Sequence, residues 1–284
     1  MPTAFCPGHI TCFFAPGRTD GDLLCRGSRG VGIRTTLGAT VELNETSGSK
    51  VDVTIDGASS DAPVTRHVLE ELLPGRGVEV VVTNGLPVSQ GFGMSAAGAV
   101  AAALCATEVA GLPEARAWEA AHKAEIIGGG GLGDVSALSL PAHVPVRESE
   151  GLPPHGRVTC SCTSFSVLSV AVIGPKMHTG QVLSDPERRR RITDAGESSM
   201  RVFNGTRASL FEQSNRFSSV AGVEAPELTS AIRTLHEGHR RAAMCMLGNS
   251  LFTDSPVIMV RDALPDADVF SMMSTSEPAR VVKK

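Results

Sequence analysis

The stretch GLPVSQGFGMSAAGAVAAAL, residues 85–104, changes character halfway along its length. It begins as a loop rich in glycine, proline and serine and continues as an almost unbroken run of alanine, the strongest helix former. The β-branched run before it, VEVVVTN over residues 78–84, is typical of a buried strand. The pattern therefore predicts a strand, a flexible loop and a helix from about residue 95 to residue 110.

A strand that leads through a glycine-rich loop into a helix is an arrangement that binds phosphate. The first N–H groups of a helix have no partners inside it and point toward a bound anion. Glycines allow the backbone to approach phosphate oxygens without a Cβ in the way. A hydroxyl at the helix start, here Ser95, can donate to a phosphate or bind Mg²⁺. We therefore expect this loop to hold a nucleoside triphosphate.

Two other interpretations of the loop are weaker. The glycines could serve only the close packing of the helix. Residues 91–96 also match the dinucleotide fingerprint G-x-G-x-x-A. That fingerprint requires a tight turn directly after the strand and a second strand after the helix, and neither is predicted here. The loop is not a Walker A motif, because G-K-[ST] does not occur in the chain.

Two carboxylates follow in AHKAEIIGGGGLGDVSAL, residues 121–138, where Asp134 stands nine residues after Glu125 across a glycine-rich turn. Near a triphosphate, one carboxylate can complete the Mg²⁺ shell with Ser95, and the other can orient or deprotonate an attacking hydroxyl. Each residue also has a structural interpretation, Glu125 as a surface charge and Asp134 as a helix cap. The combination with the loop favours the functional interpretation.

The rest of the chain predicts an irregular alternation of strands and helices, which indicates the α+β class. Strands are expected at residues 40–45, 51–55, 164–174 and 266–274, and helices at residues 62–75, 113–127, 186–195 and 227–237. The segment ESEGLPPHG, residues 148–156, is polar and rich in proline and glycine. It predicts a boundary between two domains, residues 1–155 and 156–284.

Composition excludes several classes of protein. A net charge of −4 argues against a nucleic-acid binder, and we interpret the basic run DPERRRR, residues 185–191, as a solvated helix start. The sequence contains no run of about 20 apolar residues, which a membrane-spanning helix would require. Seven cysteines in a chain too large to need disulfides favour a reducing compartment, so we expect a cytoplasmic protein.

Two segments resemble motifs of the GHMP kinase superfamily. CPGHIT, residues 6–11, resembles the first motif, with His9 where many members carry lysine. LPVSQGFGMSAAG, residues 86–98, resembles the second motif, P-x-x-x-G-L-G-S-S-A, in which Phe92 replaces leucine and Met94 replaces the first serine. Within that superfamily the chain resembles the archaeal pantoate kinase family. The blocks that carry this resemblance occur in order between residues 7 and 252: PGHITCFFAP, GSRGVG, LPVSQGFGMSAAGA, GLGDVSA and MLGNSLF. One departure is the C-terminal glycine-rich motif, which is reduced to Gly248.

The resemblance implies an enzyme that uses ATP and Mg²⁺ to phosphorylate (R)-pantoate to (R)-4-phosphopantoate in archaeal coenzyme A biosynthesis. It implies a two-domain GHMP kinase fold, with an N-terminal domain like ribosomal protein S5 domain 2 and a ferredoxin-like C-terminal domain. Ser95 and Glu125 would hold Mg²⁺, and Asp134, together with Ser95, would be catalytic. The ATP-binding residues would be Pro87, Ser89, Gly91, Phe92, Gly93, Met94, Ser95 and Ala96.

A carboxylate substrate requires a cation, and Arg29 in GSRGVG is the candidate, because its planar guanidinium suits a carboxylate. Ser28 and His9 are the other expected substrate contacts. Arg29 could equally be an exposed arginine in a turn, and His9 a structural histidine. Two alternatives to the function stay open, the same chemistry on mevalonate or a homoserine-like alcohol, and a nucleotide-binding regulator without turnover. The sequence also leaves open whether the chain forms a homodimer.

Overall fold

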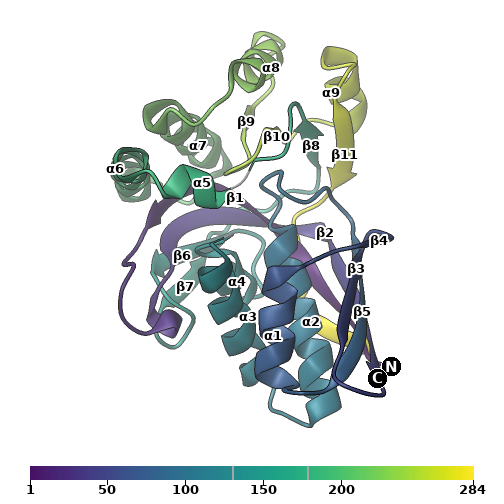
Figure 1. Cartoon of the computed structure of the whole chain (residues 1–284). Helices are drawn as coiled ribbons and strands as arrows, with labels where there is room; N and C mark the ends of the chain where they lie inside the picture. Colours follow the sequence, from purple (N-terminus) through teal and green to yellow (C-terminus); the bar gives the residue numbers. More distant parts are fainter. Residues whose placement is uncertain (130, 178) are drawn as a thin grey trace.

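The computed structural model describes residues 1–129, 131–177 and 179–284, and within these residues the strands form two sheets (Figure 1). The first sheet has the strand order β12-β1-β2-β5-β3-β4, and β6 pairs with β2 and β7 beside this path. Its members are β1 (Thr3–Pro16), β2 (Ser28–Thr46), β3 (Val51–Ile55), β4 (Ala58–Ser59), β5 (Gly77–Asn84), β6 (Pro145–Ser149), β7 (Arg157–Cys160) and β12 (Arg280–Lys283).

The long antiparallel pair of β1 and β2 is the backbone of the molecule. The stretch FCPGHITCFFAP, residues 5–16, contains one glycine and two prolines, yet β1 is one continuous strand. The glycines allow close contact between strands instead of interrupting them. A Cβ on Gly38 of β2 would lie 2.0 Å from the carbonyl oxygen of Cys6 in β1. Between β1 and β2, the loop at residues 17–27 contains the short 3₁₀ helix η1 (Leu23–Cys25).

Helices cover one side of the first sheet, and the second unit lies on the other side of β1 and β2 (Figure 1). The covering helices are α1 (Pro63–Leu72), α2 (Met94–Ala110), α3 (Ala115–Gly128) and α4 (Asp134–Leu138). The alanine run lets α2 pack directly on β1 and β2, with α1 and α3 on its flanks. Every residue of α2 from Ala96 to Thr107 is buried, so this helix belongs to the core.

The second sheet is antiparallel, with the order β11-β8-β10-β9 (Figure 1). Its strands are β8 (Leu168–Val172), β9 (Ala242–Met244), β10 (Ser250–Thr253) and β11 (Asp268–Met272). The helices are α5 (Thr179–Leu183), α6 (Pro186–Val202), α7 (Arg207–Ala221), α8 (Pro226–Glu237) and α9 (Val257–Ala263). Helices separate β8 from β9, and α9 separates β10 from β11. This is the strand–helix–strand–strand–helix–strand succession of a ferredoxin-like domain, as expected.

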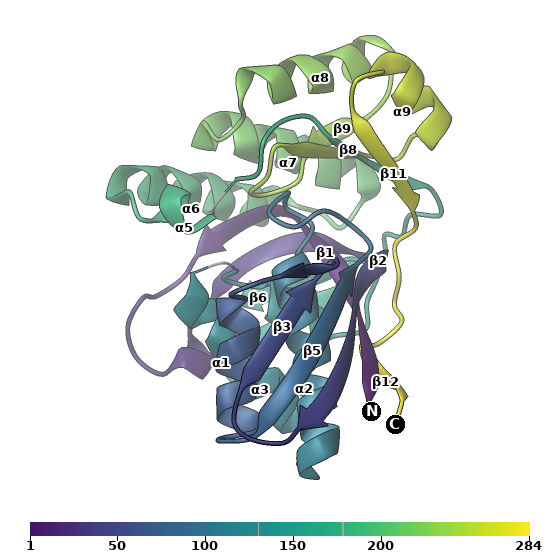
Figure 2. The same cartoon turned by 45° about the vertical axis from the view of Figure 1, so that its right-hand side comes forward.

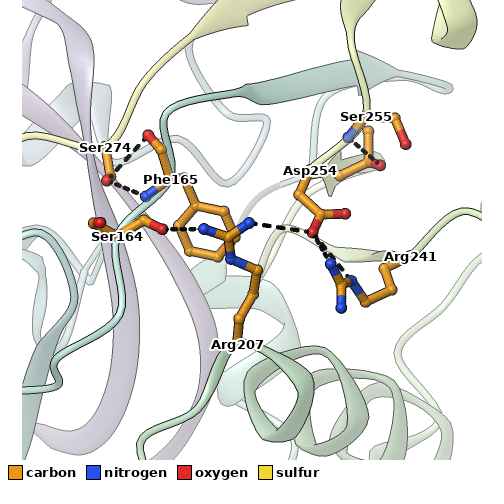
Figure 3. A network of polar contacts seen from close by, with 8 residues as sticks. Ser164, Phe165, Arg207, Arg241, Asp254, Ser255 and Ser274 are labelled. Carbon is orange, nitrogen blue, oxygen red and sulfur yellow. Dashed lines mark hydrogen bonds and ion pairs between the residues drawn. The ribbon is translucent and has the colours of Figure 1, made fainter.

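A polar network ties the layers of this second unit together (Figure 3). Asp254, at the end of β10, forms ion pairs with Arg207 at the start of α7 and with Arg241 before β9. The Arg207 guanidinium lies 4.7 Å from the centre of the Phe165 ring, and the Phe165 N–H donates to Ser274 Oγ at 2.7 Å. One carboxylate therefore connects a helix to two strands of the sheet.

The α+β class is confirmed, and each predicted element overlaps an observed one, although the strand expected at residues 40–45 is only the end of β2, which begins at Ser28. Reasoning from sequence misses the helices α5, α7 and α9 and the strands β4, β6, β7, β9, β10 and β12, the last of which returns to pair with β1. The division into domains of residues 1–155 and 156–284 stays a proposal. Two strands of the proposed C-terminal domain, β7 and β12, pair within the first sheet. The two chain ends lie close together in both views (Figure 2). In the described chain, no helix is long and apolar enough to cross a membrane.

Candidate active site

The glycine loop between β5 and α2 needs glycine at two positions. Gly91 and Gly93 have φ angles of 78° and 65°, in the left-handed region that favours glycine. A Cβ on Gly91 would lie 2.5 Å from the carbonyl oxygen of Cys245, and one on Gly93 would lie 2.7 Å from that of His9. The loop therefore packs closely between β1 and the segment that joins β9 to β10.

Hydrogen bonds hold the loop from both sides. From β1, the backbone N–H of His9 donates to the Phe92 carbonyl at 3.1 Å. From the second unit, Ser250 Oγ donates to the Gln90 carbonyl at 2.6 Å, and the Met177 N–H donates to the Ser89 carbonyl at 3.0 Å. The two units of the protein thus meet at this loop and fix its backbone.

The start of α2 suits an anion. Gly93 is its N-cap residue, and no side chain of the described residues caps the first turn. The first N–H groups of this 17-residue helix therefore remain available at the positive end of its dipole. Phe92, Met94 and Ala96 have buried side chains, which leaves backbone groups as their means of contact with a nucleotide. Pro87 is half-buried, whereas Ser89 and Ser95 are exposed.

Ser95 and Glu125, the pair that the family resemblance assigns to Mg²⁺, are joined by a hydrogen bond. Ser95 Oγ donates to Glu125 Oε1 at 2.5 Å. Glu125 comes from α3, is 2% exposed, and has its pKa raised from 4.5 to about 7, chiefly by burial. The Ser95 hydrogen bond lowers this pKa, and the nearby charge of Asp134 raises it. A buried carboxylate with a raised pKa can lose its proton when a cation binds beside it.

Asp134 stands at the first turn of α4 and is half-buried. Its Oδ1 lies 2.6 Å from His9 Nδ1 and accepts from Thr11 Oγ1 at 3.3 Å. Burial alone would raise the pKa of Asp134, but the His9 hydrogen bond and the charge of Arg147 hold it below the usual range. Asp134 is therefore an ionised carboxylate at neutral pH.

Glu125 and Asp134 converge on Gly131. A Cβ on Gly131 would lie 2.6 Å from Glu125 Oε2 and 2.9 Å from Asp134 Oδ2. A side chain at this position would therefore have to displace one or both carboxylates. The structure therefore brings together the Ser95 hydroxyl and the carboxylates of Glu125 and Asp134, the three groups that the sequence predicts to act beside the loop.

Arg147 of β6 is a residue of the site that reasoning from sequence misses. It is 1% exposed, its Nε donates to the Ser28 carbonyl at 3.3 Å, and its Nη1 has no hydrogen-bond partner among the described residues. It lines one cavity together with Asp134. The lining of that cavity is Thr11, Phe14, Ser28, Gly131, Leu132, Gly133, Asp134, Arg147, Leu183, Met246 and Leu247. A buried guanidinium with a free N–H beside such a cavity suits a carboxylate or a phosphate.

The residues expected to bind the substrate do not lie in one cavity. Ser28 lines the cavity of Asp134, whereas Arg29 lines a different one and forms an ion pair with Glu197 of α6. Neighbouring residues of a strand point to opposite faces, which explains the difference. His9 is completely buried and lies behind Asp134 rather than on the cavity wall.

Comparison with known proteins places this geometry among kinases. Residues 62–140 match the family model described as "GHMP kinases N terminal domain". A pantoate kinase of Thermococcus kodakarensis is 31% identical over 91% of this chain and 87% of its own length. A pantoate kinase of Methanospirillum hungatei is 29% identical over 88% of this chain and 86% of its own. A solved structure described as "Phosphotransferase related to CoA biosynthesis pathway" has a TM-score of 0.86 and 26% identity, and covers 99% of this chain and 98% of its own.

Proposed function

The chain belongs to the pantoate kinase family, and we propose that it transfers the γ-phosphoryl group of ATP to the 4-hydroxyl of (R)-pantoate. The products are (R)-4-phosphopantoate and ADP, in the route to coenzyme A. The observation that carries the proposal is the cavity lined by both Asp134 and Arg147, whose Nη1 has no hydrogen-bond partner among the described residues. Pantoate has a hydroxyl for the first group and a carboxylate for the second.

The phosphates of ATP bind the glycine loop. The backbone amides at the start of α2 face them, and the loop residues Ser89–Ala96 wrap around them, with Pro87 at the beginning of the loop. Because the hydrogen bonds from β1 and from the second unit fix this backbone, the amides need little reorganisation on binding. This contact positions the γ-phosphoryl group beside Ser95.

Ser95 and Glu125 would hold Mg²⁺. Nowhere in residues 1–129, 131–177 and 179–284 do three or more His, Cys, Asp or Glu side chains gather as they would around a structural metal ion. A hydroxyl and a carboxylate nevertheless fit Mg²⁺, which prefers oxygen and usually completes its shell with water and substrate phosphates. When bound, the ion neutralises charge on the transferring phosphoryl group.

The transfer itself requires positioning and one proton acceptor. Arg147 Nη1 donates to the pantoate carboxylate, with Ser28 beside it. The 4-hydroxyl then points at Asp134, whose carboxylate accepts the proton as the hydroxyl oxygen bonds to the γ-phosphorus. The bond from that phosphorus to the bridging oxygen breaks, and ADP leaves with the electron pair. The low pKa of Asp134 ensures that the carboxylate is ionised when substrate arrives.

We place the reaction in the cytoplasm, where ATP is available. Cys160 and Cys162 are exposed free thiols, which are typical of a reducing compartment.

The function is tested by release of ADP with a panel of alcohols at equal concentration: pantoate, pantothenate, mevalonate and homoserine. We expect clear preference for pantoate. Preference for mevalonate or homoserine would reject the substrate and keep the kinase. Bound ATP with no turnover on any alcohol would instead favour a regulatory protein.

Replacing Ser95 with alanine is expected to weaken the use of Mg·ATP by about ten- to a hundredfold and to leave the fold intact. The substitution removes one ligand and one hydrogen bond of the charge-assisted kind, worth about 1.5–3 kcal/mol, and alanine suits a helix start sterically. The apparent affinity for Mg²⁺ is measured by titration of activity. Activity equal to that of the unsubstituted protein at limiting Mg²⁺ would remove Ser95 from the site.

Glu125→Gln is expected to raise the Mg²⁺ requirement and to stabilise the metal-free protein at high pH. The pKa of Glu125 is higher in the folded state, at about 7, than its unfolded value of 4.5. Proton binding to Glu125 therefore stabilises the fold fully below pH 4.5, and this stabilisation is lost as pH rises through about 7. Glutamine has no proton to lose and avoids that loss, which is at most roughly 3 kcal/mol. Thermal unfolding with a chelator at about pH 5 and about pH 8 checks this expectation. As pH rises, the unfolding temperature of the variant should increase relative to that of the unsubstituted protein. A difference that does not change with pH would contradict the proposal.

A further inference from the structure

One residue of β1 contacts both halves of the site. The backbone N–H of His9 donates to Phe92 in the phosphate-binding loop, and the ring Nδ1 lies 2.6 Å from Asp134 Oδ1. The loop follows β5 and Asp134 opens α4, so these two parts reach the site from different elements. A change in the position of His9 would therefore move one part relative to the other.

The surroundings of the His9 ring fix its protonation. The ring is fully buried, and its Nε2 has no partner in the part of the chain that the structure describes. A Cβ on Gly32 would lie 2.2 Å from Nε2, so this nitrogen faces the backbone of β2. An N–H there would be a buried donor without an acceptor, which is costly. Burial lowers the pKa of His9 and, with the charges of Arg147 and Arg34, outweighs the hydrogen bond and charge of Asp134, which raise it. The ring is therefore neutral, and its one proton is on Nδ1.

With this tautomer, the two carboxylate oxygens of Asp134 have different partners. A carboxylate can only accept, so His9 Nδ1–H donates to Oδ1, where Thr11 Oγ1 donates as well. Oδ2 lies on the side of Gly131, where a Cβ would come within 2.9 Å of it. One oxygen is thus held by the protein, and the other is left for the substrate.

We propose that His9 is a positioning residue, a neutral Nδ1–H donor that fixes Asp134 Oδ1 so that Oδ2 accepts the proton of the substrate hydroxyl. It acts through Asp134 and does not contact the substrate. This role rests on the proposed kinase function. It differs from the substrate contact that the sequence suggests for His9, because the ring lies behind the carboxylate.

A pair of substitutions tests the donated hydrogen bond. His9→Ala removes the donor, and kcat should fall by about 10²-fold, as expected for a misplaced catalytic group. His9→Asn places an amide N–H where Nδ1 stood and should restore kcat to within about threefold of the unsubstituted protein. In both variants the backbone N–H that holds the loop is retained, so KM for ATP and for pantoate should change little.

His143 offers a matched control. Its Nδ1 lies 2.9 Å from Ser274 Oγ, a similar ring-to-side-chain contact outside the cavity of Asp134. His143→Ala should leave kcat within about threefold of the starting value. Equal losses in His9→Ala and His9→Asn would overturn the proposal, as would no loss in either. A rise in KM without a fall in kcat would also overturn it, since it would indicate a direct substrate contact.

A spectroscopic measurement on the unsubstituted protein keeps the test independent of activity. Long-range ¹H–¹⁵N correlation of the full chain labelled with ¹⁵N-histidine reports which ring nitrogen carries the proton. The His9 signal is assigned as the one that is missing in His9→Asn. We expect a protonated Nδ1 and an unprotonated Nε2. The opposite tautomer, or a doubly protonated ring, would overturn the proposal. Failure of the proposed function would appear differently, as absence of pantoate-dependent ADP release in the unsubstituted protein.

Discussion

Asp134→Asn should lower kcat by about 10²–10⁴-fold, the usual contribution of a positioned base. Asparagine keeps the shape of the side chain, and its Oδ1 can still accept from His9 and Thr11. The amide nitrogen then takes the place of Oδ2, where it cannot accept a proton. KM for ATP should change little, because the glycine loop is untouched. Single-turnover phosphoryl transfer, measured by rapid quench, separates this step from product release.

Asp254→Asn is the matched control for Asp134→Asn. Asp254 is also a carboxylate paired with cations, but it lies in the polar network of the second unit (Figure 3). Its substitution should reduce thermal stability and leave kcat within about threefold of the starting value. Normal turnover by Asp134→Asn would mean that the proton leaves by another route and that positioning alone carries catalysis.

Arg147→Lys should raise KM for pantoate by about ten- to a hundredfold and spare KM for ATP. Lysine keeps the charge but loses the planar set of donors, and a charge-assisted hydrogen bond is worth about 1.5–3 kcal/mol. Arg29→Lys is the comparison, because Arg29 lines a different cavity and is paired with Glu197. It should leave KM for pantoate nearly unchanged. The reverse pattern would return the substrate carboxylate to Arg29.

The parts of the site that the sequence predicts are those encoded locally. Strand, glycine loop and alanine-rich helix form one continuous segment, so the loop and Ser95 can be placed without knowledge of the fold. Glu125 and Asp134 also lie close together in the sequence, on the two sides of one glycine-rich turn, and the structure joins Ser95 to Glu125.

The remaining parts depend on contacts between distant segments. Arg147 belongs to the site only because β6 pairs with β2 and its side chain turns inward. No motif marks it, although a charged residue within the apolar pattern AHVPVRE is a weak signal that could have suggested a buried arginine. The choice between Ser28 and Arg29 requires the register of β2 against β1, which the sequence does not supply. His9 is predicted as a contact of the substrate, and only the packing of β1 against α4 reveals the hydrogen bond to Asp134.

The most direct test of the central claim is the position of the phosphate on the product. The purified protein is incubated with Mg·ATP and (R)-pantoate, and the product is examined by ³¹P NMR with and without proton decoupling. We predict one new phosphomonoester signal, split by the two protons of the C4 methylene group and formed in equal amount to ADP. A phosphate on the C2 hydroxyl, split by a single proton, or ADP formed without any phosphorylated pantoate, would contradict the proposed reaction.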